Sequence, residues 1–190
     1  MAEPVDLDPD GYGGTYKLIA GTAALDFANL VSYRGTSRMH DWLVPFANAY
    51  GWAAAAGLPA PEPAEGQQLM ELRELLARLF LAIADGEEPA RGDIDTVGSL
   101  AASALGRRTL RFRSGVAEWV EHAPSLRDVL AEDATRILTD PGLLGALRAC
   151  PGCRWLFLDA TKNHRRTWCD PADCGNRARQ RRHYERRRKP

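Results

Sequence analysis

Four cysteines lie in one C-terminal window, as two pairs separated by fifteen residues. The first pair is Cys150-Pro-Gly-Cys153, and the second is Cys169-Asp-Pro-Ala-Asp-Cys174. Two short loops of this kind can each supply two thiolates to one tetrahedral Zn²⁺, and the proline and glycine residues within them favour tight turns. The spacing predicts one structural zinc ion, because four protein ligands leave no open position for a catalytic water.

Other uses of the thiols remain open at this point. An iron–sulfur cluster could take the same four thiolates, and the spacing alone does not separate it from zinc. His164 is conceivable as a substitute ligand, although with four thiols present we expect it on a loop or at the surface. Two disulfides are disfavoured, because the acidic start MAEPVDLDPD lacks the basic and apolar regions of a secretion signal and we expect a cytoplasmic protein. No apolar run approaches the ~18 residues that span a bilayer, so no membrane partner is expected.

The net charge of zero hides a strong asymmetry along the chain. Residues 1–147 contain 12 Lys and Arg against 21 Asp and Glu, a balance of −9, whereas residues 148–190 contain 13 against 4, a balance of +9. An acidic body with a basic tail favours a polyanionic partner at one end of the molecule. The alternative is a solvated tail that keeps the protein soluble.

The basic tail follows the last cysteine directly. Its sequence GNRARQRRHYERRRK contains no helix breaker beyond Gly175 and predicts a helix that presents arginines on adjoining faces. A zinc site that fixes the base of such a helix is typical of a nucleic-acid reader, in which phosphate contacts supply affinity and contacts to guanine edges supply specificity. Sparse aromatic residues favour duplex DNA over a single strand.

The rest of the chain shows mostly helical periodicity. A short strand over 15–21 leads to Thr22 as the N-cap of a helix through Val31, and apolar steps of three and four residues predict a long helix over 67–85. The alternating segment 107–113 predicts an exposed strand, which we expect to pair with 15–20. Further helices are expected in four ranges: 45–56, 93–105, about 125–138, and a short one from Pro141 to the first cysteine.

These elements define the expected fold class: mainly α with a minor β element. We expect a mostly helical domain over 1–143, followed by a small four-cysteine finger with a basic C-terminal helix over 144–190. About 40 residues rich in arginine bury too little apolar surface to fold alone, so zinc would supply folding free energy. Trp155, Phe157 and Trp168 are the expected miniature core over the metal, with RWLFL as a strand.

Polar residues near the first helix raise the question of an effector. Asp26, Asn29 and Arg34 could line a pocket for a small molecule, although we favour the alternative that Asp26 and Asn29 satisfy buried backbone groups. A homodimer formed through the body would suit a two-fold DNA site. No enzyme is expected, because the histidines form no recognisable constellation with a nucleophile.

The C-terminal residues also carry a resemblance. The stretch CPGCRWLFLDATKNHRRTWC, followed by four residues and CGNR, closely resembles the bacterial CGNR zinc-finger proteins, in which C-x2-C, an F-x-D strand, a basic R-R-W-C-type segment and C-G-N-R follow in order. Thr167 separates the paired arginines from Trp168, which is a small departure. Upstream, ALDFANLV at 24–31 and the W-x4-G-L pattern at 52–58 are similar to the ABATE domain, with Leu30 where that motif has threonine.

The resemblance implies a stress-linked bacterial transcription regulator whose zinc-bound C-terminus binds double-stranded DNA. Two alternatives remain: an RNA-binding accessory protein, and a thiol redox switch in which zinc release melts the tail. The predicted zinc ligands are Cys150, Cys153, Cys169 and Cys174. The predicted nucleic-acid contacts are Arg165, Arg166, Asn176, Arg177, Arg181, Arg182 and Arg188.

Overall fold

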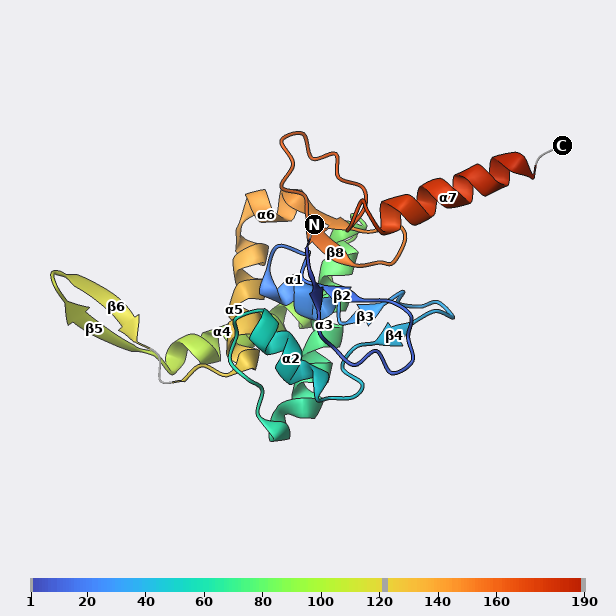
Figure 1. Cartoon of the computed structure of the whole chain (residues 1–190). Helices are drawn as coiled ribbons and strands as arrows, with labels where there is room; N and C mark the ends of the chain where they lie inside the picture. The colour runs from blue at the N-terminus through green and yellow to red at the C-terminus, as the bar shows by residue number, and fades with distance from the viewer. Residues whose placement is uncertain (1, 121–122, 189–190) are drawn as a thin grey trace.

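The computed structural model describes residues 2–120 and 123–188. Helices dominate, and the described strands form two-stranded antiparallel sheets (Figure 1). The helices are α1 (Ala23–Ala28), α2 (Asn48–Ala55), α3 (Gly66–Ala84), α4 (Arg91–Gly106), α5 (Leu126–Thr139), α6 (Pro141–Ala146) and α7 (Cys174–Arg187), with a 3₁₀ turn at Pro63–Glu65. The strand pairs are β1 (Pro4–Val5) with β2 (Tyr16–Lys17), β3 (Val31–Ser32) with β4 (His40–Asp41), β5 (Thr109–Arg113) with β6 (Val116–Val120), and β7 (Leu147–Ala149) with β8 (Leu156–Leu158).

The fold class predicted from the sequence is confirmed, and its central element is α3. Leucines at helical spacing place Leu69, Leu72, Leu76 and Leu79 on one buried face of α3, which packs against α1, α4 and α5. Helix α5 begins at a capping box, in which the Ser125 hydroxyl accepts a hydrogen bond from the Asp128 backbone amide at 3.2 Å. The helices expected near 93–105 and 125–138 are therefore present.

Helix α1 starts differently from the prediction. Thr22 occupies the N-cap position, but its side chain makes no capping hydrogen bond. Instead, the carboxylate of Asp133 on α5 accepts a hydrogen bond from the Ala24 backbone amide at 2.8 Å. The helix also ends at Ala28 and not at Val31, because Val31 enters a strand paired with β4. A tertiary partner thus supplies the cap that the sequence assigned to Thr22.

Two strand predictions are wrong. The segment 107–113 pairs with 116–120 in a hairpin and not with 15–20, and within 15–21 the strand covers only Tyr16–Lys17, which pair with Pro4–Val5. Gly115, at a φ of +85°, and Ser114, at +51°, provide the left-handed backbone of a two-residue turn. The strand therefore pairs with its neighbour across a local turn, and not with the distant segment that the sequence suggested.

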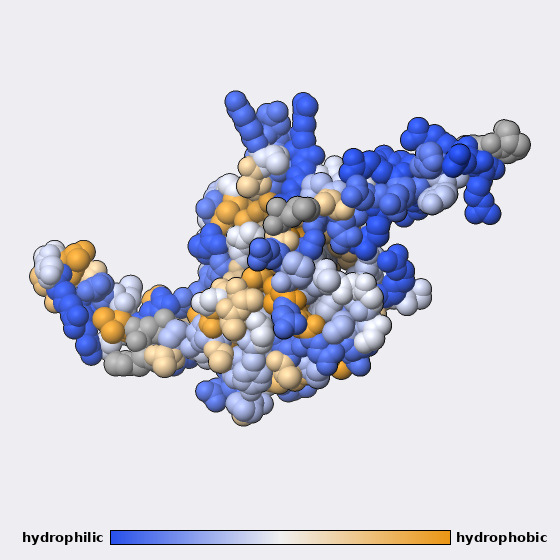
Figure 2. Space-filling model, viewed as in Figure 1, coloured by the Kyte–Doolittle hydropathy of each residue, from blue (hydrophilic) through white to orange (hydrophobic). Residues whose placement is uncertain are grey.

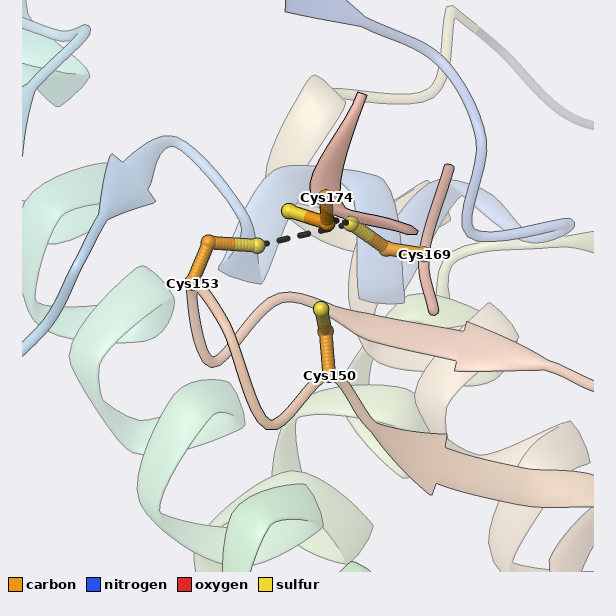
Figure 3. Close-up of side chains that lie close together, drawn as sticks. All are labelled: Cys150, Cys153, Cys169 and Cys174. Carbon is orange, nitrogen blue, oxygen red and sulfur yellow. Dashed lines mark hydrogen bonds between the residues drawn. The ribbon is translucent and has the colours of Figure 1, made fainter. Parts of the chain in front are cut away.

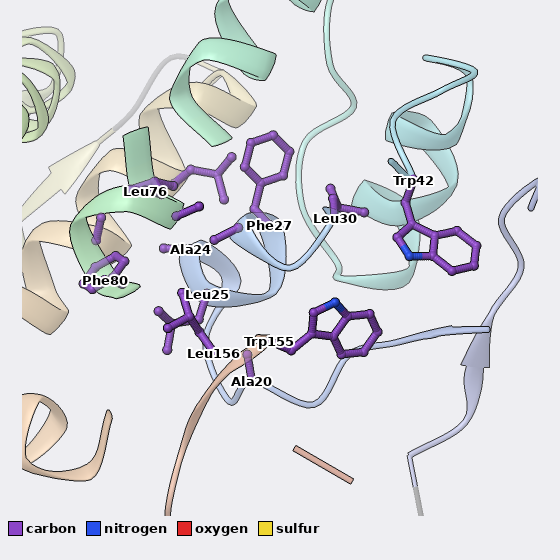
Figure 4. Close-up of a cluster of buried hydrophobic side chains, with 14 of the residues drawn as sticks. Ala20, Ala24, Leu25, Phe27, Leu30, Trp42, Leu76, Phe80, Trp155 and Leu156 are labelled. Atoms are coloured by element: carbon purple, nitrogen blue, oxygen red, sulfur yellow. The ribbon is translucent and has the colours of Figure 1, made fainter. Parts of the chain in front are cut away.

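The hydrophobic core joins the N-terminal and C-terminal parts of the chain (Figure 4). Trp155, Leu156 and Phe157 are buried in the same cluster as Phe27 on α1 and Phe80 on α3. The expected miniature core over the metal is therefore wrong in its position, because two of its three members face the helical body. The predicted division between residues 143 and 144 falls inside α6, which packs against α5.

Asp26 on α1 is a buried acid, and we expect it to make the free energy of unfolding depend on pH. Burial raises its pKa from 3.8 to about 6, against the opposing effect of hydrogen bonds from the backbone amides of Ala20 and Ile19, each at 3.0 Å. The folded protein therefore holds this proton more tightly than the unfolded chain does. The resulting stability is present below the unfolded pKa of 3.8 and is lost as the pH rises through about 6.

The Asp26→Asn variant tests this expectation, because an amide oxygen can accept the same two hydrogen bonds without a charge. The difference in free energy of unfolding between this variant and the wild type should shift in favour of the variant by up to about 3 kcal/mol as the pH rises from about 4 to about 7. Urea melts across that range would measure the difference. Comparison at each pH cancels the contributions of the other acids. A difference that stays constant with pH would contradict the expectation.

Candidate metal centre and basic helix

The first cysteine pair lies on the turn between β7 and β8. Cys150 follows β7, and its backbone amide donates to the carbonyl of Trp155 at 2.8 Å, which closes the turn. The Gly152 backbone amide donates to the Cys150 sulfur at 3.4 Å, and Arg154 adopts a positive φ of 65° to complete the reversal. This turn places both sulfurs on one side of the chain (Figure 3).

The second pair is shaped by Asp170. Its backbone carbonyl accepts hydrogen bonds from the amides of Asp173 and Gly175, each at 3.2 Å, and its carboxylate accepts one from Ala172 at 2.8 Å. These bonds turn the chain after Cys169 so that Cys174 becomes the first residue of α7. The metal-binding pair and the basic helix are therefore one continuous piece of structure.

The four sulfur atoms form a compact cluster. All lie within 4.8 Å of one another, with Cys153 and Cys169 at 3.4 Å and Cys169 and Cys174 at 3.7 Å. Tetrahedral zinc with bonds of about 2.3 Å would set sulfur–sulfur distances near 3.8 Å, whereas a disulfide needs about 2.05 Å. The sulfurs belong to free cysteines and are buried. Geometry and donor chemistry thus fit one structural zinc, held by the four predicted ligands.

The four thiols share their protons unequally. Hydrogen bonds from the neighbouring thiols, first of all that of Cys153, lower the pKa of Cys150, whereas the hydrogen bond with Cys150 raises the pKa of Cys153 and of Cys169. The pKa of Cys174 is lowered, because hydrogen bonds with Cys153 and Cys169 outweigh the opposing effect of Cys150, and the guanidinium of Arg177 helps by donating to the Cys174 sulfur at 3.4 Å. A cation nearby therefore offsets part of the negative charge that four thiolates bring together.

Trp168 packs between two glycines of the finger. A Cβ added at Gly152 or at Gly175 would lie 3.3 Å from the indole ring, closer than most side-chain contacts allow. These two glycines let the ring approach the backbone closely beside the metal ligand Cys174. The expected contribution of Trp168 to the finger is therefore seen, as packing beside the metal ligands and not as part of a separate core.

Backbone and side-chain hydrogen bonds tie the finger to the helical body. The Tyr33 amide donates to the carbonyl of Cys153 at 3.0 Å, and the Leu158 amide donates to the carbonyl of Ala20 at 2.8 Å. The Lys17 ammonium pairs with the Asp170 carboxylate at 2.7 Å, with both side chains largely buried. These contacts hold the metal centre against the N-terminal segment.

Asn29 connects the body to the finger through two side-chain hydrogen bonds to the backbone of one residue. Its side-chain amide donates to the Leu156 carbonyl at 2.8 Å, and its side-chain carbonyl accepts from the Leu156 amide at 2.7 Å. The residue therefore pairs with β8 as another strand would, and it is 2 % exposed. The sequence placed Asn29 among candidate effector ligands, with backbone satisfaction as the favoured alternative; the observed bonds follow that alternative.

The other two candidate effector residues also have protein partners. Asp26 accepts hydrogen bonds from the two backbone amides described above. Arg34 forms an ion pair with Glu74 on α3 and donates to the carbonyl of Ala28 at 3.3 Å. An effector that binds them stays a prediction.

Two of the predicted nucleic-acid residues contact the finger itself. Arg166 donates to the carbonyls of Trp168, at 3.0 Å, and of Cys169, and its guanidinium lies 4.5 Å from the centre of the Phe157 ring. Arg177 bonds to the Cys174 sulfur, as described above, and pairs with Asp173 at 3.1 Å. Their predicted contacts to nucleic acid stay predictions, but both have a structural task that the sequence did not show.

The remaining predicted residues are exposed. Arg165 lies on the loop before Trp168, and Asn176 donates to the carbonyl of Ala172 at 2.6 Å at the start of α7. Beyond the buried Ala178, the helix projects from the body and carries arginines on its surface (Figures 1 and 2). The exposed arginines of this projecting part, with the residue that follows it, are Arg179, Arg181, Arg182, Arg186, Arg187 and Arg188.

Lys162 is a candidate that the sequence analysis did not single out. An open groove of about 500 Å³ runs along the loop 161–168 and is lined by Lys162, Arg165, Arg166 and Trp168 among others. Three cations beside an indole ring are typical of a surface that binds a phosphate backbone. The signal in the sequence was the KNHRR run, which contains the lysine beside the two arginines.

The fold and the site together define a zinc-finger protein with a helical N-terminal domain. The chain belongs to the ABATE family, described as "putative stress-induced transcription regulator", whose family match covers residues 21–141. Residues 147–187 match the CGNR zinc finger, so both parts of the predicted resemblance are confirmed. No curated protein matches the chain. No helix in the described part of the chain is long and apolar enough to cross a membrane.

Proposed function

We propose that this protein is a transcription regulator that binds duplex DNA through α7 and the loop 161–168. One observation carries the proposal: the first residue of α7 is a metal ligand, and the exposed arginines begin one turn later. A zinc ion at that position fixes the direction of the helix relative to the body. Binding then costs little ordering of the helix base, and the arginines meet phosphates from a defined direction.

The contacts divide into two groups. Arg179, Arg181, Arg182, Arg186 and Arg188 supply cations along the projecting helix, and Lys162 and Arg165 supply cations beside the loop groove. Arg166 and Arg177 belong to neither group, because they donate hydrogen bonds within the finger: Arg166 to the carbonyls of Trp168 and Cys169, and Arg177 to the Cys174 sulfur. The family description supports a regulator and gives no DNA sequence.

Duplex binding is expected to weaken as the salt concentration rises, and the slope of log affinity against log salt reports the number of phosphate contacts. Arg182→Ala should reduce the affinity for a labelled duplex about tenfold and lower the slope of log affinity against log salt by about one. Fluorescence anisotropy over a salt series would measure both. Arg91→Ala, at a side chain 94 % exposed on α4, is the matched control and should change neither.

The same assay separates the competing functions. Structured RNA that binds more tightly than duplex DNA at equal salt would favour an RNA-binding role. An unchanged slope for Arg182→Ala would show that α7 does not meet phosphates. The redox-switch alternative has less physical support, because the four cysteine residues are at most 5 % exposed and oxidants attack accessible thiolates. An effector is not part of the proposal, because Asp26, Asn29 and Arg34 bond to the protein itself.

A further inference from the structure

The β5–β6 hairpin projects from the body on the side opposite to α7 (Figure 1). We call residues 109–120 the arm. Its large apolar side chains are exposed: Phe112 is 74 % exposed, Val116 60 %, Leu110 57 % and Trp119 55 %. Apolar residues are visible at the end of this projection in the space-filling view (Figure 2). Exposed aromatic residues gathered on one element mark a surface that meets a partner.

The strand register sorts the arm into two faces. Leu110 pairs with Trp119 and Phe112 pairs with Ala117, so these four residues share one face, which is wholly apolar. The opposite face carries the pairs Arg111 with Glu118, Arg113 with Val116, and Thr109 with Val120. The arm is therefore amphipathic, and among the described residues no core packs beneath its apolar face.

The exposed apolar face of the arm would be more stable if another surface packed against it. A lone two-stranded hairpin is marginally stable in water, and it becomes stable when a further layer packs on its apolar face. We propose that this layer is the same face of a second copy of the chain, so that two arms pack face to face about a two-fold axis. The inference does not depend on DNA binding.

The area available is sufficient for such a contact. The exposed parts of Phe112, Trp119 and Leu110 amount to roughly 400 Å² for each arm, given about 150–250 Å² for a whole aromatic side chain. Two arms would bury about 800 Å² of apolar surface. This area lies at the low end of the range for protein–protein interfaces and is typical of a weak, concentration-dependent dimer.

The charges favour face-to-face packing over pairing at the strand edges. If two β5 strands paired about a two-fold axis, Arg111 would lie opposite its own copy, and two β6 strands would likewise bring Glu118 opposite Glu118. Like charges in direct opposition destabilise a strand pair. Face-to-face packing leaves both charged faces in water and keeps the Arg111–Glu118 cross-strand pairs within each arm.

A nucleic acid fits the arm less well than a second copy does. The arm and α7 extend from opposite sides of the body, so a short duplex on α7 would not reach the arm (Figure 1). The face that lacks a cover consists of Leu110, Phe112, Ala117 and Trp119, which offer no donor suited to phosphate beyond one indole N–H. A polyanion would instead choose the arginine face, and the apolar face would remain exposed.

The mass of the protein in solution tests the inference. Light scattering after size exclusion should give 2 × 20.9 = 41.8 kDa for the wild type and 20.9 kDa for the double variant Phe112→Asp, Trp119→Asp. Val116→Asp places the same charge on the opposite face of the same hairpin and should remain a dimer. Phe112→Leu, which keeps an apolar side chain, should also remain largely dimeric. Thermal melts check that each variant stays folded, which we expect because these side chains lie outside the core.

Three results would overturn the inference: a wild type that is monomeric at every accessible concentration, a dimer that survives Phe112→Asp with Trp119→Asp, and a dimer that Val116→Asp disrupts equally. A monomeric wild type whose duplex affinity falls in the Phe112→Asp, Trp119→Asp variant would assign the arm to nucleic acid instead. Loss of duplex binding in Arg182→Ala would bear on the proposed function alone and would leave the dimer unaffected.

Discussion

Replacing Cys174 with serine is expected to lower the free energy of unfolding of the whole chain, and not only that of its C-terminal part. The Cys174 sulfur belongs to the cluster of four, and the cluster is buried in the same core as Phe27 and Phe80. Structural zinc supplies about 10–16 kcal/mol of apparent binding free energy in small finger peptides, which exceeds the total stability of many domains. The loss of one ligand should therefore cost about 5 kcal/mol or more.

Urea unfolding in zinc-containing buffer, followed by both tryptophan fluorescence and far-UV circular dichroism, would measure this effect. The wild type should unfold in one transition, and Cys174→Ser should do so at a much lower midpoint. Thr167→Ser, an equally conservative change at an exposed finger residue, is the control and should leave the midpoint in place. If Cys174→Ser kept the helical transition of the wild type and lost only a small C-terminal one, the shared core would be refuted.

Asn29→Ala should have the next largest effect on stability. The alanine would leave both the N–H and the C=O of Leu156 without their partner in a place where water has little access. Each unsatisfied buried backbone group costs about 1–3 kcal/mol, so the variant should lose about 2–6 kcal/mol. The same urea melts provide the readout.

Asn176→Ala provides the matched comparison for Asn29→Ala. Asn176 also donates to a backbone carbonyl, that of Ala172, but it is exposed, and water can replace it. Its loss should cost less than about 1 kcal/mol. Equal costs for the two variants would mean that Asn29 does not join α1 to β8 in the way that the structure indicates.

The elements that the sequence predicted well are those whose signal is local. The leucine spacing of α3 reports a buried helical face directly, and the cysteine spacing reports four ligands for one ion. The start of α6 at Pro141 was predicted correctly, and the Asp140 carboxylate there accepts a hydrogen bond from the Gly142 amide at 2.8 Å. Its predicted end at the first cysteine is wrong, because the helix ends at Ala146 and β7 follows. Each of the correctly predicted features depends on residues that are close together along the chain.

The features that the sequence missed depend on partners far along the chain. Asn29 forms hydrogen bonds with Leu156, Asp133 caps α1, and Lys17 forms an ion pair with Asp170. No local sequence pattern around these residues predicts which partner each one contacts. The strand 107–113 was recognised, but its partner was wrong, since alternation predicts a strand and not its neighbour. The arginine run posed a similar problem, because composition could not separate Arg177, which serves the metal centre, from Arg182 on the projecting part of α7.

Hydrogen exchange on the reduced wild-type protein, with its metal content measured before and after chelation, tests most directly that one ion stabilises both parts of the chain. We predict one zinc per molecule and, after its removal, loss of amide protection in α1 and β8 together with the base of α7. A reduced protein that binds no metal, or one whose α1 and α7 keep full protection after chelation, would contradict this account.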